Sequence, residues 1–308
     1  MSINLDEASL ALNGGSRTRL KGWQDNFTLG EEEMQAALRV IESGYLSLFE
    51  GSFSPDEPFS FLGGPEVQAL EKEWEQYYGV ENAVCMNSAT SGLFAAIGAL
   101  GLGYGDEVIV SPYTMTACAL APLIYGAIPI FADVESQSGC LSLESIQDRV
   151  TDRTRAILVV HQFGFPADMP AIMEFASARG LHVIEDCAQA HGASINGQPV
   201  GTFGDIGVFS LNVNKTIQVG EGGICVTHDG NLAYRLRLIR NHGEAVVGPA
   251  GYADIVNIAG FNYRLTELQA AMAREQLKKL DLLNNRRLEM VRLLIDLLDN
   301  NPYLSVLT

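Results

Sequence analysis

The feature that most restricts the fold is a series of seven short apolar runs, separated for much of the chain by segments of helical length. Between the first five runs, the intervening segments are long enough for the crossover helices that parallel strands require. The sequence therefore predicts an α/β protein with a mainly parallel central sheet between helices. The predicted strands lie at 83–86, 107–110, 128–132, 156–160, 182–185, 206–210 and 224–227.

One part of this region needs a check against a membrane span, because residues 108–132 carry no charge over a length that could cross a bilayer. Three prolines, Pro112, Pro122 and Pro129, interrupt the segment. A strand, a short buried helix and a second strand explain it better. The N-terminal sequence MSINLDEASL also lacks a basic region followed by an apolar stretch, so we expect neither a membrane span nor a secretion signal.

The charge and the cysteines limit the partners and the compartment. The net charge is −17, and basic residues cluster only weakly, on the segment after Arg264. This disfavours nonspecific binding to nucleic acid or to an anionic membrane, although a local site could still accept an anionic substrate. The five cysteines lack the spacing of a metal site, so we expect no metal, reduced thiols and a cytoplasmic protein.

The segments on either side of the α/β region predict helices. Residues 31–43 form an amphipathic pattern, residues 46–64 are rich in Gly, Pro and Ser, and apolar residues recur at helical spacing from about 266 to 299. We therefore divide the chain into three parts. These are an N-terminal helix and loop (1–63), a large α/β domain (64–263), and a long helical segment that begins a small C-terminal domain (264–308).

Lys215 stands out because it is the only lysine or arginine between Arg179 and Arg235. It lies between an apolar run and the glycine-dense turn GEGG at 220–223. A lysine reacts with carbonyl compounds when its surroundings leave part of its amine unprotonated. Taken alone, such a lysine is more often an exposed loop residue.

Two other motifs follow predicted strands. HVIEDCAQAHGA (182–193) ends a strand at Glu185 and Asp186, where ligands gather in parallel sheets, so a carboxylate there could hold a proton on a cationic heterocycle. NSATSG (87–92) opens an apolar helix, whose free N–H groups suit a phosphate. Helix capping without a ligand is the alternative for both motifs. A carbonyl-reactive lysine, a carboxylate and a phosphate cradle are together the parts that pyridoxal phosphate needs.

From about Gly64 to Asp281 the sequence resembles the fold-type I pyridoxal-phosphate enzymes, and more narrowly the sugar aminotransferases of the DegT/DnrJ/EryC1/StrS family. The likeness is carried, in the family's order, by GGPEVQALEKEW, NSATSG, GDEVIVSPYT, HQFGFPADM, VIEDCAQAHGA, GTFGDIGVFS, NKTIQVGEGG, RNHG and GFNYRLTELQAA. It implies a pyridoxal 5'-phosphate enzyme, with pyridoxamine 5'-phosphate as intermediate. Its reaction would move an amino group from glutamate or glutamine to a nucleotide-linked keto sugar or a keto-cyclitol.

The resemblance also assigns roles by position. Lys215 would bind the cofactor covalently and move a proton between substrate and cofactor carbons, Asp186 would pair with the pyridinium nitrogen, and Gln189 would lie near the phenolic oxygen. The sharing of a cofactor across an interface would make the protein a homodimer with a shared active site. The phosphate would be held by Ala89, Thr90, Ser210 and, from a second subunit, Asn262.

Three departures from the family pattern follow from the same comparison. Met115 stands where the family has an aromatic residue on the cofactor ring, so either Tyr113 or the thioether of Met115 would cover the ring. The loop 46–64 is longer than usual, and we hypothesise that it helps to select the substrate. The chain ends at Thr308, before most of a small C-terminal domain, which implies an incomplete sequence or a shortened form.

Two functions other than that of an aminotransferase are the alternatives for this sequence. A nicotinamide oxidoreductase is disfavoured, because no GxGxxG motif joins the first strand to its helix. The other alternative is a non-catalytic pyridoxal-fold subunit that binds cofactor or a partner in a regulatory role; Met115 and the early end favour it. Lys215 and Asp186 together favour the aminotransferase, and a lysine at 215 differs from the histidine of the related sugar dehydratases.

Overall fold

The computed structural model describes residues 10–17, 19–22, 27–51, 59–243, 246–248, 251, 253 and 255–298. All seven predicted strands form, and they join in one sheet of order β1-β9-β8-β5-β4-β2-β3. The strands are β1 (Asn82–Met86), β2 (Glu107–Val110), β3 (Ile128–Phe131), β4 (Thr154–Val160), β5 (His182–Asp186), β8 (Ile206–Ser210) and β9 (Gly223–Thr227).

The prediction of a mainly parallel sheet is confirmed, with one strand running the other way. Strand β9 is antiparallel to both of its neighbours, β1 and β8, whereas the remaining pairs are parallel. The connection from β8 to β9 contains no crossover helix, so β9 returns beside β8 in the opposite direction. A separate small hairpin pairs β6 (Ser194–Ile195) with β7 (Gln198–Pro199).

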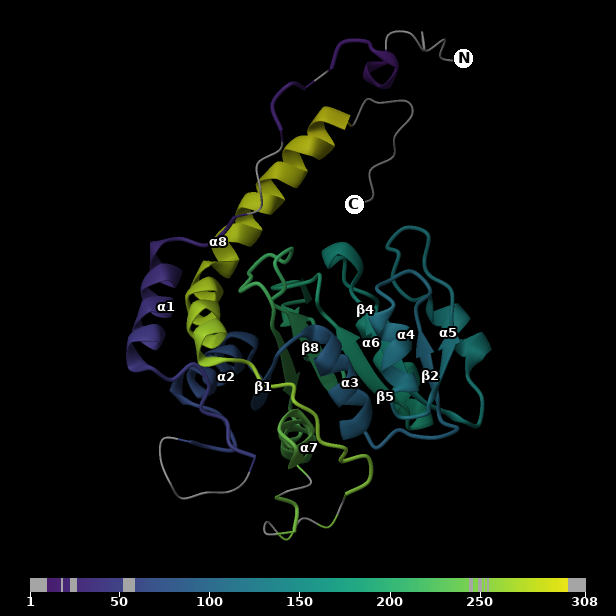
Figure 1. The fold of residues 1–308 in the computed structure, drawn as a ribbon. Helices are drawn as coiled ribbons and strands as arrows, with labels where there is room; N and C mark the ends of the chain where they lie inside the picture. Colours follow the sequence, from purple (N-terminus) through teal and green to yellow (C-terminus); the bar gives the residue numbers. More distant parts are fainter. Residues whose placement is uncertain are drawn as a thin grey trace.

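Helices cover both faces of the sheet and make three layers (Figure 1). One face carries α3 (Ala89–Ala99), α4 (Ala117–Leu123) and α7 (Gly230–Arg240). The other carries α2 (Pro65–Tyr78), α5 (Leu143–Arg149), α6 (Met169–Arg179) and the first part of α8 (Glu267–Leu298). Helix α1 (Glu31–Ser43) packs on α8, and two 3-10 turns, η2 (Ala11–Asn13) and η3 (Gln162–Gly164), complete the described elements.

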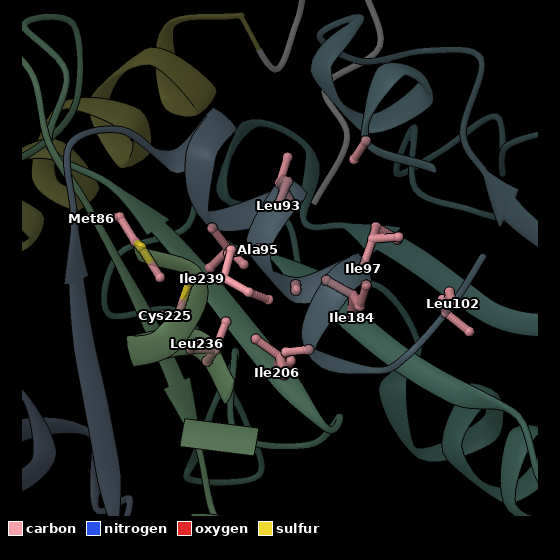
Figure 2. Packing of buried hydrophobic residues seen from close by; sticks show 14 of the residues in the cluster. Met86, Leu93, Ala95, Ile97, Leu102, Ile184, Ile206, Cys225, Leu236 and Ile239 are labelled. Carbon is pink, nitrogen blue, oxygen red and sulfur yellow. The ribbon is translucent and has the colours of Figure 1, made fainter. Parts of the chain in front are cut away.

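An apolar cluster fixes α3 and α7 on the sheet (Figure 2). Leu93 and Ile97 of α3 and Ile239 of α7 are buried with Ile184 and Ile206 of the strands. Burying one such side chain contributes about 1.5–3 kcal/mol. Because both faces of the strands other than the edge strand β3 are covered, these strands read as continuous apolar runs, and the carboxyl ends of the parallel strands are held at one edge of the sheet.

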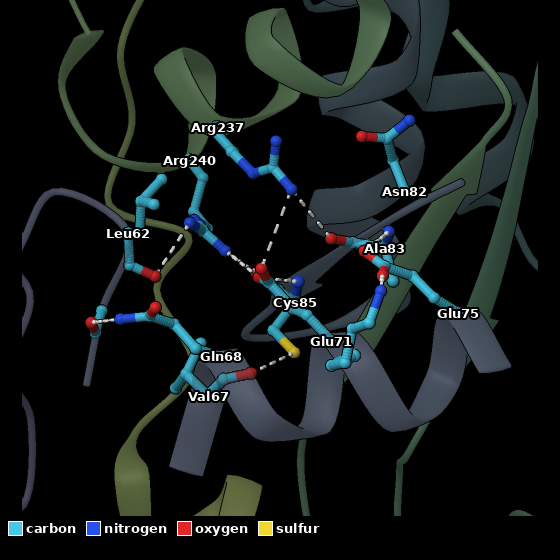
Figure 3. Close-up of polar contacts among 12 residues, drawn as sticks. Leu62, Val67, Gln68, Glu71, Glu75, Asn82, Ala83, Cys85, Arg237 and Arg240 are labelled. Carbon is cyan, nitrogen blue, oxygen red and sulfur yellow. Dashed lines mark hydrogen bonds and ion pairs between the residues drawn. The ribbon is translucent and has the colours of Figure 1, made fainter. Parts of the chain in front are cut away.

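A buried ion pair joins α2 to α7 beside the edge strand β1 (Figure 3). The guanidinium of Arg240 lies 2.6 Å from Oε1 of Glu71, and the backbone N–H of Cys85 donates to the same oxygen at 2.9 Å. Arg237 approaches the other oxygen of Glu71 at 4.0 Å. Removal of either partner would leave a buried charge unpaired, which is strongly destabilising. Because Glu71 also accepts the N–H of Cys85, the pair fixes the position of the end of β1. The NSATSG motif follows directly after β1 and contains the start of α3, so its position is fixed with that of the strand.

The predictions for the segments on either side of the α/β region, and for the uncharged segment 108–132, can be compared with the structure of the described residues. The predicted helix at 31–43 is α1, and the helical segment from about 266 corresponds to α8. The uncharged segment 108–132 is strand, short helix and strand, as expected. Among the described residues, no helix combines the length and apolar composition needed to cross a membrane. Part of the predicted loop, 52–58, lies outside the described residues, and the division into three parts stays a prediction.

Candidate active site

A cavity of about 210 Å³ opens at the carboxyl edge of the parallel strands. Its wall is formed by the start of α3, the loop before α4, the end of β5 and the loop after β8. Segments far apart in the sequence therefore meet at this cavity. The predicted site residues that line it are Ala89, Thr90, Met115, Asp186, Gln189, Ser210 and Lys215.

Two predicted site residues are not among the lining residues of this cavity. The half-exposed ring of Tyr113 lies edge-on to Phe163, with 6.1 Å between the ring centroids. Met115, rather than Tyr113, forms the wall of the cavity. Asn262 is exposed and pairs with Asn241 through an isolated bridge, so its role in a second subunit's site stays a prediction.

Asp186 ends β5 and is buried, with one hydrogen bond to each carboxylate oxygen from the described residues. Oδ1 accepts the backbone N–H of Ala188 at 3.0 Å, and Oδ2 accepts the thiol of Cys118 at 3.1 Å. A carboxylate offers about four lone-pair directions, so Asp186 retains unused acceptor capacity beside the cavity. This arrangement suits the N–H group of a cationic ligand.

Glu185, the preceding residue, is fully buried and has its acceptors filled. Its oxygens accept the backbone N–H groups of Gly201, Phe203 and Gly204 at 2.7–2.8 Å, and Nε2 of His161 lies 3.0 Å away. His161, Glu185 and Cys187 bring possible metal-ligand atoms within 4.8 Å of one another. Because the carboxylate already binds four protein donors, this cluster holds two loops together and offers little to an ion.

Asn212 organises the turn that carries Lys215. Its backbone carbonyl accepts the N–H of Lys215 at 2.9 Å, and its side-chain oxygen accepts the N–H of Asn214 at 3.4 Å. Its amide also donates to Oε1 of Glu221 at 2.9 Å. These bonds form a side-chain-stabilised turn, which leaves the partly buried Lys215 on the cavity wall.

The start of α3 provides the expected anion-binding geometry. Ser88 caps the helix by accepting the N–H of Ser91 at 3.0 Å. The N–H groups of Ala89 and Thr90, in the first turn, have no acceptor within the helix. Gly223 passes so close that a Cβ there would lie 2.4 Å from the carbonyl carbon of Ser88. Glycine is therefore required where β9 crosses this helix start.

Gln189 and His191 follow Asp186 in the same segment. Oε1 of Gln189 accepts the N–H of Phe163 at 2.8 Å, which ties the cavity wall to the loop after β4. His191 is buried against Trp74 and Phe209. Burial first, and then the nearby charge of Lys215, lower the pKa of His191 to about 4. The imidazole is therefore neutral near pH 7 and adds no charge beside Lys215.

Several residues of the site were not predicted from the sequence. Thr114, Asn212 and Glu221 line the cavity, and Cys118 contacts Asp186 from behind it. The pattern NVNK carries a signal for Asn212, because asparagine before a turn commonly bonds to backbone groups two residues further on. Cys118 has no local signal, since its partner lies 68 residues away in the sequence.

This sheet, with a lysine, a buried carboxylate and a helix start at its carboxyl edge, has the architecture of the fold-type I pyridoxal-phosphate transferases. More narrowly, the model of the DegT/DnrJ/EryC1/StrS aminotransferase family matches residues 57–308, and the chain belongs to that family. The family predicted by the sequence motifs is thus confirmed.

Individual relatives show how much of the chain is shared. It is 44% identical over 229 residues to UDP-N-acetyl-3-dehydro-alpha-D-glucosamine 3-aminotransferase of Acidithiobacillus ferrooxidans, covering 74% of this chain and 60% of that relative. It is 33% identical to L-glutamine:2-deoxy-scyllo-inosose aminotransferase of Streptomyces kanamyceticus, covering 97% of this chain and 70% of that protein. The chain thus spans less than two thirds of the length of the first relative.

A solved structure supports the fold and the type of cofactor. E. coli GDP-4-keto-6-deoxy-D-mannose-3-dehydratase with bound hydrated PLP matches with a TM-score of 0.80 and 26% sequence identity. The match covers 92% of this chain and 74% of that chain. The α/β architecture described above is therefore one that holds pyridoxal phosphate in a related protein.

Proposed function

We propose that the protein is a pyridoxal-phosphate-dependent aminotransferase that moves an amino group from glutamate or glutamine to a keto sugar linked to a nucleotide, or to a keto-cyclitol. The observation that carries this proposal is the meeting of Lys215, Asp186 and the start of α3 in one cavity. These groups come from separate segments of the chain. An amine that can react with a carbonyl group and a carboxylate with unused acceptor capacity are both able to bind a ligand in the cavity.

The groups present fit pyridoxal phosphate part by part. The N–H groups of Ala89 and Thr90, with the hydroxyl of Ser210, would hold the phosphate. The unused acceptor capacity of Asp186 would receive the ring N–H, and the amine of Lys215 would bind the aldehyde. When bound, the cofactor supplies a carrier for the amino group and a ring that withdraws electrons.

The chain's own residues would then perform the remaining steps. The carboxylate of Asp186 favours a protonated ring nitrogen, because an opposite charge stabilises the cationic form. Nζ of Lys215 would take a proton from the carbon that bears the donor's amino group, and in the second half of the reaction it would give a proton to the carbon of the acceptor that receives the amino group, acting as general base and then as general acid. Met115 would pack against the ring, and Gln189, fixed by Phe163, would lie near the phenolic oxygen.

The relatives support the choice of substrates. One is named for a dehydro sugar carried by UDP, and the other for L-glutamine and a deoxy inosose. Both acceptors are ring ketones, which is why we propose that class for this chain.

We propose that the working protein is a homodimer with shared sites. Asn262 is exposed and is not among the residues lining the cavity of its own chain. It pairs with Asn241, whose amide donates to the carbonyls of Glu50 and Phe61, both within the segment 46–64. Asn262 is therefore connected through Asn241 to Glu50 and Phe61. Asn262 would act at the partner's cavity, where the loop 46–64 would select the acceptor.

Complementation tests this arrangement. Shared sites predict that two inactive variants, Lys215→Ala and Asn262→Ala, recover about a quarter of the activity when they are refolded together, because mixed dimers contain one intact site. If mixed dimers form but no activity is recovered, the active sites are not shared between subunits.

We also propose that the protein works in the cytoplasm. All five cysteines, Cys85, Cys118, Cys140, Cys187 and Cys225, are buried free thiols, as expected in a reducing compartment. Fractionation of producing cells tests this proposal, and recovery outside the cytoplasm would contradict it.

The reaction is tested by following the nitrogen. The protein is incubated with pyridoxal phosphate, ¹⁵N-labelled glutamate or glutamine, and a panel that contains a nucleotide-linked 3-keto sugar and an inosose. The proposal predicts a ¹⁵N-labelled amine on one acceptor, detected by mass spectrometry. If both donors keep their label with every ketone of the panel, the proposed substrates are wrong.

A further inference from the structure

A thiol lies behind the carboxylate of the proposed cofactor site. Cys118, near the start of α4, is fully buried, and its Sγ lies 3.1 Å from Oδ2 of Asp186. Its neighbours Met115 and Ala117 line the cavity, whereas Cys118 is not among the lining residues. The thiol therefore reaches Asp186 from the protein side, which leaves the cavity side of the carboxylate open.

The direction of this hydrogen bond is set by the chemistry of the pair. A carboxylate accepts and cannot donate, so the thiol is the donor. Burial, followed by the charge of Asp186, raises the pKa of the Cys118 thiol, which consequently stays protonated. The hydroxyl of Thr114 lies 3.7 Å from the same sulfur, which extends the contact towards the cavity wall.

The two donors to Asp186 bind different oxygens of its carboxylate. The backbone N–H of Ala188 binds Oδ1, and Cys118 binds Oδ2, so the carboxylate is held at both ends. An S–H group is a weak donor, so it orients an acceptor while neutralising less of its charge than a hydroxyl or a cation would. Most of the negative charge of the Asp186 carboxylate therefore remains available to a group in the cavity.

Cys118 also packs in the apolar cluster beneath α3 and α4, and this packing would be retained only by an apolar side chain of similar size, which neither alanine nor serine provides. Packing alone does not place the sulfur within hydrogen-bonding distance of a carboxylate. The two roles can therefore be separated by experiment.

We propose that Cys118 is a positioning residue for the aminotransferase reaction: its thiol fixes the carboxylate of Asp186 in the orientation that receives the ring N–H of pyridoxal phosphate. This proposal rests on the proposed function of the site. It concerns a residue that touches neither cofactor nor substrate and acts through Asp186.

The first test needs no cofactor. Infrared difference spectra of the full chain, wild type minus Cys118→Ala and wild type minus Cys225→Ala, isolate the two S–H stretching bands. The thiol of Cys225 is buried and makes no hydrogen bond to the described residues, so it gives the frequency of an unbound thiol. The proposal predicts a lower frequency for Cys118. Equal frequencies would overturn it, whatever the protein binds.

The second test compares Cys118→Ala and Cys118→Ser with wild type in binding pyridoxal phosphate labelled with ¹⁵N in its ring. Loss of the donor in the alanine variant is expected to weaken binding about tenfold. It should also move the ring ¹⁵N resonance towards that of a neutral pyridine. The serine variant keeps a donor and is expected to stay within about threefold of wild type. Cys140→Ser is the matched control, because its thiol donates to the carbonyl of Phe165 at 3.3 Å, away from the cavity.

The outcomes separate the two roles. If Cys118→Ala binds as wild type does, with an unchanged ring resonance, the proposal is wrong. Equal weakening in the alanine and serine variants would assign Cys118 to packing alone and would also overturn it. If wild type itself does not bind pyridoxal phosphate, the proposed function fails, and the infrared bands still decide whether Cys118 holds Asp186.

Discussion

Glu185 and Asp186 are adjacent on β5 and both buried, but they belong to two different regions of the molecule. Alternation along the strand sends their side chains to opposite faces of the sheet. Glu185 accepts four bonds and joins the loop after β4 to the loop before β8. Asp186 accepts two from the described residues and borders the cavity.

The difference shows that burial alone does not identify a ligand-binding carboxylate. What separates the two residues is acceptor capacity: Glu185 has used its lone pairs on protein donors, and Asp186 has kept some beside an opening. A filled carboxylate contributes to stability, and one with unused acceptors is available for a ligand. The following predictions test this distinction, in order of decreasing effect.

Removal of the filled carboxylate should destabilise the fold. Glu185→Ala leaves three N–H groups, one buried and two part-buried, without their acceptor, so we expect the free energy of unfolding to fall by about 3–5 kcal/mol. Urea denaturation followed by circular dichroism measures the change. Glu174→Ala, an exposed glutamate on α6, serves as the control and should change stability by less than about 0.5 kcal/mol. Equal stability of the two variants would refute the structural role of Glu185.

Acid should weaken the fold through His191. Its pKa is about 4 in the folded protein, compared with an ordinary value of 6.5. Below pH 6.5 the unfolded chain therefore binds a proton that the folded protein does not, and stability is lost as pH falls towards 4. We expect a loss of about 3 kcal/mol by pH 4. His191→Phe should lack this contribution, so parallel stability curves for the two proteins between pH 7 and 4 would contradict the prediction.

Replacement of the available carboxylate should affect the reaction and spare the fold. Asp186→Asn keeps the shape of the side chain but removes its charge, so we expect kcat/KM to fall about a hundredfold or more, equivalent to about 2.7 kcal/mol. The free energy of unfolding should change by less than about 1 kcal/mol. Steady-state kinetics and urea denaturation measure the two quantities. A loss of stability as large as that of Glu185→Ala would abolish the distinction.

The smallest expected effect concerns the turn of Lys215. Asn212→Ala removes two side-chain hydrogen bonds, to Asn214 and Glu221, and should lower the rate about tenfold by loosening the turn. Asn231→Ala, on α7 and away from the cavity, is the control. If both variants keep the wild-type rate, Asn212 does not position Lys215.

The sequence predicted the strands well, because strands buried on both faces are continuous apolar runs that can be recognised locally. It did not predict the direction of β9, which depends on how the segment 211–222 returns beside β8. That segment forms the turn of Lys215, and it contains no crossover helix.

The site could be predicted in part for a related reason. The carboxyl ends of parallel strands meet at one edge, so motifs that follow strands are expected to lie together, and Lys215, Asp186 and Gln189 do so. The contact of Cys118 with Asp186 could not be predicted, since it depends on how α4 lies against β5. The open choice between Tyr113 and Met115 likewise depended on side-chain directions, and Met115 is the one that lines the cavity.

We propose that Lys215 and Asp186 form a pyridoxal-phosphate site at which the cofactor accepts an amino group from a donor. The most direct measurement is the visible absorption spectrum of the purified protein with added pyridoxal phosphate, before and after glutamate or glutamine, for wild type and Lys215→Ala. We expect a band in wild type that is absent in the variant and that bleaches when a donor is added. A band that forms without Lys215, or no band at all, would contradict the assignment of Lys215 as the cofactor-binding lysine. A Lys215-dependent band that no donor bleaches would instead favour a subunit that binds the cofactor without transamination.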